Sequence, residues 1–377
     1  MLSAAALVVG GARHLALASD LIRGERLAWP SPLQDAFPAI LQRRGQPVVV
    51  LASGDPFHYG VGGQLVTLVT SGEWRCLPQP SAFSLAAARL GWLQQDIKLV
   101  SLHGRSLGRL VPHLAGGARI FALSWDGRTP KVVADLLVER GFGSSRLTVL
   151  EALGGPRERV RTVAARVFDL DGIDPLNTIA IEVVAEPDAR VLGLTPGRPD
   201  ALFENDGQLT KQVIRAVTLA SLAPRPGELL WDIGLGAGSV AIEWLLAHPS
   251  LRAIGIEARS DRAERARRNA EALGADALEV VIGRAPEALA GLLQPDAVFV
   301  GGGMAQPVFE IAWERLARGG RLVANAVTLE TEALLLDLHA RHGGELVRLE
   351  TARAEAVGPR HGWRPAMPIL HWRVVKP

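Results

Sequence analysis

One short segment, DIGLGAGS at residues 232–239, has the residue types of a cofactor-binding loop. Asp232 is followed by three glycines at alternate positions, which are Gly234, Gly236 and Gly238. Glycine lets the backbone turn sharply and lie close to a ligand. No Gly-Lys-Ser/Thr follows, which argues against a phosphate-binding loop. The spacing is G-x-G-x-G and not the G-x-G-x-x-G of dinucleotide sites, so we expect a different cofactor.

A cationic cofactor suits this loop better than a phosphate does. S-adenosylmethionine carries a positive sulfonium and a positive amino group, which favour a nearby acid such as Asp232, whereas a pyrophosphate would be repelled by it. Glu257 ends the next strand-like run, IGIE, where acids of related folds accept hydrogen bonds from a ribose diol. A loop aspartate alone is often only a helix cap. Asp232, the glycines and Glu257 together predict a methyltransferase site, and a glycine-rich turn without a ligand is the alternative.

Strands and helices must position these residues, and the sequence after residue 200 predicts both. A helical stretch at 209–223 ends before Pro224 and Pro226. The expected strands that follow are ELLWDIG, RAIGIEA, LEVVIG, DAVFVGGG and RLVANAV, and the expected helices between and after them are AGSVAIEWLLA, DRAERARRNAEALG, PEALAGLL, PVFEIAWERLARGG and LETEALLLDLHARHG. These five βα units predict an α/β fold with a doubly wound parallel sheet. The last two runs, GELVRLETA and MPILHWRVV, predict strands added at one edge.

The first half also alternates between strand-like and helical runs, but less regularly. The expected strands are PVVVLAS, IKLVSL, RIFALSW, SRLTVLEAL and NTIAIEVVA, and the expected helices are SAFSLAAARLGWL and TPKVVADLLVERG. The segment 187–206 contains prolines and glycine with little periodicity, so we expect a linker there. Because the glycine patterns of the halves differ, we expect two unrelated domains, at 1–190 and 200–377.

Composition argues against several classes of protein. The net charge is only +2 and no basic stripe is interleaved with aromatic residues, so we expect no nucleic-acid partner. The richest apolar stretch, 229–247, is interrupted by Asp232 and Glu243, so we expect no membrane span. Cys76 is the only cysteine, which excludes an internal disulfide and a zinc site built from cysteines. The chain is expected to be cytoplasmic, and we expect no metal.

A second glycine-containing loop, SGDPFHYGVGG at residues 53–63, carries a modest signal, because Gly-Asp-Pro is also common turn chemistry. Together with PSAFSLAAARLGW, SLHGRS and EALGGPRERV, it resembles the corrin-pathway branch of the tetrapyrrole methylases. The motifs DGQLTK, DIGLGAGSVAIEW, IGIEAR, DAVFVGGG and ANAVTLE resemble a decarboxylating precorrin methyltransferase. Nearly end to end, the chain is similar to the family of precorrin-6Y C5,15-methyltransferases (decarboxylating).

The resemblance implies one S-adenosylmethionine site in each domain. In the first domain it implies cofactor contacts from five residues, which are Ser53, Gly54, Asp55, Ser81 and Ala82. It implies methylation of precorrin-6B (precorrin-6Y) at carbon 5 by the first domain. It assigns methylation at carbon 15, and loss of carbon dioxide from the ring C acetate, to the second. The product would be precorrin-8X of the aerobic route to cobalamin.

Two departures from this family are visible. Its members normally begin with a strand and a Gly-x-Gly loop before the segment that matches LVVGGARHLALA, at residues 7–18 here. This chain begins almost at that segment, so we expect the first domain to lack its opening strand. Members also usually place an acid after the third strand of the second domain, near the adenine, where this chain has Arg284.

A tetrapyrrole substrate carries many carboxylates, which guanidinium groups bind in pairs of hydrogen bonds. All but four of the 41 basic residues are arginines, which fits such a substrate, although a genome rich in arginine codons explains it equally. The candidate contacts in the first domain are Arg105, Arg128, Arg157 and Arg159, each with a solvated surface charge as the alternative. In the second domain Lys211 and Arg215 share a helix face by i, i+4 spacing.

Asn325 ends the strand RLVAN, on the side where open α/β sheets bind substrates, and it is a candidate catalytic residue together with Lys211. A satisfied strand-end amide is the alternative for Asn325, and His103 fits an ordinary loop residue. The nucleophile would be an electron-rich ring carbon, so positioning is expected to dominate over acid–base chemistry. No residue is assigned as the acid of the decarboxylation.

Other classes of protein stay open on the sequence. The second half could methylate another substrate while the first is an unrelated binding module. A nicotinamide-dependent oxidoreductase and a non-catalytic tetrapyrrole carrier are further alternatives. For the methyltransferase that the resemblance implies, we expect a small-molecule tetrapyrrole substrate and a homo-oligomer.

Overall fold

The computed structural model describes residues 1–377, which form two compact units. The first unit contains Met1–His103, Arg119–Val138 and Gly143–Glu182. The second contains Gly104–Ala118, Glu139–Phe142 and Val183–Pro377. Two short pieces of the predicted first domain therefore cluster with the second unit. No helix is both long enough and apolar enough to cross a bilayer.

The first unit begins with a small parallel sheet in the order β2-β1-β3. Its strands are β1 (Leu7–Gly10), β2 (Glu25–Ala28) and β3 (Val48–Val50), and its helices are α1 (Ala12–Leu17), α2 (Phe37–Leu41) and α3 (Gly62–Leu65). Ala5, Val8, Leu15 and Ile22 form its buried core. The segment LVVGGARHLALA thus forms the central strand and the first helix of this part.

The rest of the first unit is a mixed sheet in the order β4-β5-β8-β6-β7. Its strands are β4 (Ile97–Ser101), β5 (Arg119–Leu123), β6 (Arg146–Glu151), β7 (Arg159–Ala164) and β8 (Asn177–Glu182), and its helices are α4 (Ala82–Leu90) and α5 (Thr129–Glu139). Only β4 and β5 pair in parallel. β7 was not predicted, because this edge strand leaves most of its side chains in water and has no apolar face.

The second unit is built on a seven-stranded sheet in the order β11-β10-β9-β12-β13-β17-β14. The strands are β9 (Leu229–Ile233), β10 (Arg252–Glu257), β11 (Leu278–Ile282), β12 (Ala297–Val300), β13 (Arg321–Ala326), β14 (Glu345–Leu349) and β17 (Ile369–Val375). The first five in this order are parallel, which confirms the doubly wound sheet. β17 lies antiparallel between β13 and β14, so the two extra strands are at one edge, as predicted.

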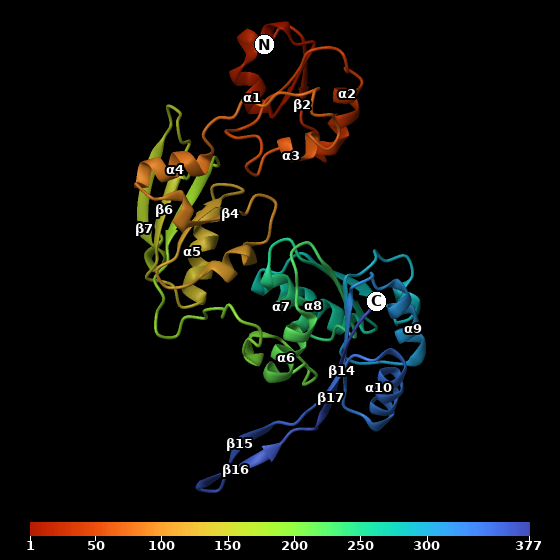
Figure 1. The fold of residues 1–377 in the computed structure, drawn as a ribbon. Helices are drawn as coiled ribbons and strands as arrows, with labels where there is room; N and C mark the ends of the chain where they lie inside the picture. The colour runs from red at the N-terminus through yellow and green to blue at the C-terminus, as the bar shows by residue number, and fades with distance from the viewer. The chain divides into compact units, whose positions relative to one another are not determined.

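Helices cover both faces of this sheet. They are α6 (Gln212–Leu222), α7 (Ser239–Ala247), α8 (Ser260–Leu273), α9 (Gln306–Arg315) and α10 (Leu329–His342). Figure 1 shows α7 and α8 on one side and α9 and α10 on the other. Because the chain turns one way from β9 to β10 and the other way at β12, the carboxyl end of β9 lies at a topological switch point, where open sheets bind ligands.

Two predictions for this half were wrong. PEALAGLL forms only the short 3-10 helix Glu287–Leu289, because Gly291 adopts a left-handed φ of +77° and stops the chain from winding further. A hairpin of β15 (Ala352–Val357) and β16 (Arg360–Pro365) was missed, since its strands are exposed and show no buried apolar face. Figure 1 shows this hairpin extending beyond β14 and β17.

Candidate functional site

The glycine loop between β9 and α7 has a backbone that only glycine adopts easily. Gly234, Gly236 and Gly238 have φ values of +77°, +57° and +77°, in the left-handed region. A Cβ atom at Gly234 would also lie 2.8 Å from the carbonyl oxygen of Gly302, which follows β12. The loop is therefore held close to the neighbouring strand end at the switch point.

Asp232 is placed behind this loop and is buried, with 1% of its surface exposed. Its Oδ2 accepts a hydrogen bond from the N–H of Ala241, 3.1 Å away in the first turn of α7. The pKa of Asp232 is raised to about 7, chiefly by burial and also by the charge of Glu257, against the opposing effect of the Ala241 N–H. Asp232 thus fixes the start of the helix, and it contributes a negative potential in its ionised form, which its raised pKa confines to a pH of about 7 and above.

Glu257, at the end of β10, accepts a hydrogen bond from the same loop. Its Oε2 accepts a hydrogen bond from the N–H of Gly236 at 2.8 Å, and its Oε1 accepts one from the N–H of Arg259 at 3.0 Å. The structure therefore brings together the acids and glycines that the sequence singled out in this half. Arg284, directly after β11, is exposed.

Asn325 lies in a chain of polar groups at the carboxyl end of β13. Its Nδ2 donates to Oγ1 of Thr218 at 3.0 Å, and its Oδ1 is 2.7 Å from Nδ1 of His371, which faces it from β17. Nε2 of His371 is 2.8 Å from the hydroxyl of Ser221. Burial lowers the pKa of His371, so the neutral ring donates from Nδ1 to Asn325. These hydrogen-bonded side chains link α6 to β13 and β17. This link was not predicted.

The prediction that Lys211 and Arg215 share one face of a helix was wrong. α6 begins one residue later, at Gln212, so Lys211 is its exposed N-cap residue. Arg215 is fully buried, and its Nε donates to Oε1 of Glu243 at 2.7 Å. Glu243 lies on α7, so a partner distant in sequence turns this arginine inward.

Glu243 also holds the segment predicted to be a linker. Its carboxylate accepts hydrogen bonds from the backbone N–H groups of Gly197 and Arg198, at 2.7 and 3.0 Å. The Arg198 side chain is buried as well, 3.4 Å from the same carboxylate. The end of the 187–206 segment is therefore docked into the second unit, and this buried cluster could not be recognised from local sequence.

The five candidate cofactor residues of the first unit meet at one place. Gly54 has a φ of +57°, and a Cβ there would lie 2.8 Å from the carbonyl oxygen of Pro80. Oδ1 of Asp55 accepts a hydrogen bond from the N–H of Phe57 at 2.8 Å. Ser81 caps α4 by accepting the N–H of Ser84, and Ala82 is the first helical residue. The Gly-Asp-Pro loop thus packs against the start of α4.

Ser53 completes this group from the end of β3. Its hydroxyl is 2.8 Å from Nε2 of His14 and accepts a hydrogen bond from Arg13 at 3.2 Å. Burial lowers the pKa of His14, and the charge of Arg13 lowers it further. The ring of His14 is therefore neutral at pH 7, and no motif of the sequence had indicated it.

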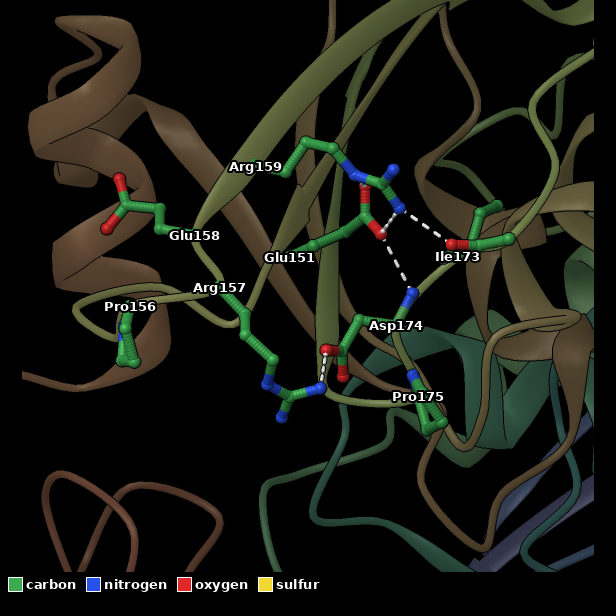
Figure 2. A pocket seen from close by; sticks show the side chains of 9 residues that line it. Glu151, Pro156, Arg157, Glu158, Arg159, Ile173, Asp174 and Pro175 are labelled. Carbon is green, nitrogen blue, oxygen red and sulfur yellow. Dashed lines mark hydrogen bonds and ion pairs between the residues drawn. The ribbon is translucent and has the colours of Figure 1, made fainter.

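The candidate substrate arginines are distributed over the first 160 residues. Arg157 and Arg159 line a cavity of about 630 Å³, where Arg157 pairs with Asp174 and Arg159 pairs with Glu151 at 2.7 Å (Figure 2). Arg128 pairs with the nearby Asp126 at 3.0 Å. Arg105 and His103 are exposed. Three of these arginines thus already have carboxylates from the chain as partners.

Comparison with known proteins places both halves among methyltransferases. Residues 1–167 match the family of tetrapyrrole (corrin/porphyrin) methylases, and residues 201–376 match the precorrin methyltransferase domain. A precorrin-6Y C(5,15)-methyltransferase (decarboxylating) from Sinorhizobium sp is 56% identical over 377 residues, which are 100% of this chain and 91% of that protein. One from Mycobacterium tuberculosis is 42% identical, over 99% of this chain and 93% of its own length. The chain belongs to the family of precorrin-6Y C5,15-methyltransferases (decarboxylating).

Solved structures include part of this family. The C-terminal domain of precorrin-6Y C5,15-methyltransferase from Rhodobacter capsulatus is 52% identical, with a TM-score of 0.47. It covers 49% of this chain and 100% of its own.

Proposed function

We propose that this chain transfers methyl groups from S-adenosylmethionine to carbons 5 and 15 of precorrin-6Y and removes one carboxyl group as carbon dioxide. Family membership supports the overall reaction. The observation that carries the cofactor assignment is the position of Glu257, whose carboxylate lies 2.8 Å from the N–H of Gly236 at the switch point. An acid beside a glycine loop suits a ligand that carries a ribose diol and a positive charge.

The residues of the second unit fit this cofactor. Glu257 would accept hydrogen bonds from the ribose hydroxyls. Gly236 leaves room for a ligand beside the backbone, since the nearest atom to an added Cβ there is 3.9 Å away. Asp232 lies behind the loop and favours a positive charge in front of it. When bound, S-adenosylmethionine supplies an electrophilic methyl group. The protein is left to align donor and acceptor, since a displacement of this kind depends chiefly on positioning.

In the first unit, we assign a second cofactor site to Ser53, Gly54, Asp55, Ser81 and Ala82. Support comes from the close packing of Gly54 against Pro80, which brings the two motifs together. The first unit would then methylate carbon 5. The second would methylate carbon 15 and release carbon dioxide from the ring C acetate. The domain boundary between 190 and 200 and the homo-oligomeric state stay predictions.

A direct test combines the purified chain with precorrin-6Y and S-adenosylmethionine that carries ¹³C in its methyl group. The expected product has gained two labelled methyl groups and lost one carbon dioxide, and carbon NMR assigns the labels to carbons 5 and 15. In the same reaction with a Glu257→Gln chain, the label at carbon 15 should decrease more than the label at carbon 5. A wild-type chain that transfers no label to precorrin-6Y would contradict the proposal.

A further inference from the structure

The loop that carries Gly54 and Asp55 continues into aromatic side chains that remain half in water. Phe57, Tyr59 and Trp74 are 46%, 55% and 42% exposed. The rings of Phe57 and Trp74 have their centroids 5.5 Å apart, so they form one surface. Large rings gathered at the surface mark a site where a partner or ligand binds. We call Phe57, Tyr59 and Trp74 the aromatic patch.

The backbone under the patch is tightly fixed. The N–H of Gly62 donates to the carbonyl oxygen of Pro56 at 2.8 Å, and a Cβ at Gly60 would lie 2.5 Å from that same oxygen. Tyr59 has a left-handed φ of +57°, which is costly for an aromatic residue. Such conformations persist where the surroundings enforce them, commonly at functional sites. Here the hydroxyl of Tyr59 donates to the carbonyl oxygen of Leu99 at 2.9 Å and holds the ring in place.

The patch is also continuous with the core of the first unit. The ring of Tyr59 packs edge-on against Phe83, with centroids 5.9 Å apart. Phe83 is 1% exposed and stacks in parallel with Phe121. Tyr59 is therefore fixed against the core, whereas Phe57 and Trp74 contact each other at the surface.

We propose that the aromatic patch binds the conjugated ring system of the tetrapyrrole substrate beside the cofactor site of the first unit. This rests on the proposed function, which supplies a flat, conjugated, carboxylate-rich ligand. Exposed aromatic side chains stack on flat ring systems, as proteins do with nucleic-acid bases. The carboxylate of Asp55, a predicted cofactor contact, accepts the backbone N–H of Phe57, so the patch begins directly beside the predicted cofactor loop. Arg75, exposed next to Trp74 in sequence, adds a positive charge for a peripheral carboxylate.

The test uses the full chain with the substitutions Phe57→Ala and Trp74→Ala. Phe57→Tyr keeps a ring, and Trp363→Ala removes an equally large ring that is 77% exposed on β16. We expect each alanine variant to raise the KM of precorrin-6Y for carbon 5 methylation about tenfold or more, the order found when a stacking ring is removed. The KM for S-adenosylmethionine, carbon 15 methylation and the melting temperature are expected to stay unchanged, as is every value for Trp363→Ala. Phe57→Tyr, which keeps an aromatic ring, is expected to raise the KM of precorrin-6Y less than Phe57→Ala does.

Calorimetric titration of precorrin-6Y, with S-adenosylhomocysteine present to prevent turnover, separates this inference from the proposed function. If the wild-type chain transfers no methyl group, the proposed function is contradicted. Weaker binding of precorrin-6Y by the two alanine variants would in that case still support the aromatic patch as a binding site. Full activity and unchanged binding in both alanine variants overturn the inference alone. Sedimentation that shows wild-type dimers dissociating in these variants, with unchanged precorrin-6Y binding, would identify the patch as an interface between copies and overturn it too.

Discussion

The carboxylate of Glu257 lies 2.8 Å from the backbone nitrogen of Gly236, so an acid at the end of one strand touches the loop that follows its neighbour. The contact crosses from β10 to the loop after β9, and the parallel register of these strands places their ends side by side. It joins the two parts of the predicted cofactor site.

Replacing Glu257 by Gln is expected to weaken S-adenosylmethionine binding tenfold or more, because a hydrogen bond to a charged group contributes roughly 1.5–3 kcal/mol. Calorimetric titration of the full chain measures the affinity. Glu279→Gln is the matched control, because Glu279 is exposed on the adjacent strand β11. Equal affinities of Glu257→Gln and the wild type would mean that this carboxylate does not contact the cofactor.

Gly234→Ala is expected to lower the melting temperature and to prevent cofactor binding. The new Cβ would lie 2.8 Å from the carbonyl oxygen of Gly302, in addition to the strain of a φ of +77°. Gly291→Ala isolates the strain, since Gly291 has the same φ with no atom within 4 Å of the added carbon. The strain alone costs about 1–2 kcal/mol. A thermal melt in which both variants lose the same number of degrees would show that the close approach is unimportant.

The sequence predicted which residues of the second unit lie together at the strand ends, for a local physical reason. Gly234, Asp232 and Glu257 lie at strand ends, and consecutive parallel strands bring their ends together whatever the rest of the chain does. The order of the last two strands could not be predicted from the sequence, because β17 and β14 carry similar apolar patterns. Only tertiary packing places β17 next to β13.

Arg215 shows where local pattern fails. Its spacing from Lys211 predicted that both lie on one helix face as candidate substrate contacts, but Glu243 lies 28 residues further along the chain and binds Arg215 in the interior. His14 is a similar case, because its partner Ser53 is 39 residues away. Pairings at such separation have no periodic signal in a single sequence.

Asp232 is expected to make stability depend on pH. Its pKa is raised from 3.8 to about 7, so between these values the folded chain holds a proton that the unfolded chain releases. Stability must then fall as the pH rises through this interval. Asp232→Asn removes this contribution, so its melting temperature should decline less than that of the wild type between pH 5 and pH 8. Parallel curves for the two proteins would contradict a raised pKa.

Glu243→Gln is expected to destabilise the second unit strongly. The substitution removes the buried counter-charge that Arg215 and Arg198 share, and it leaves Arg215 only its ion pair with Asp200. Breaking a buried pair in this way costs about 3–5 kcal/mol. Asp337→Asn is the control, since it breaks an exposed i, i+4 pair with Arg341 whose contribution is about 0.3–0.5 kcal/mol. Denaturant unfolding of both variants, followed by the fluorescence of buried Trp231 and Trp244, measures the difference. Similar midpoints would show that Arg215 finds another partner or reaches water, and that the docked segment at Gly197 does not depend on this carboxylate.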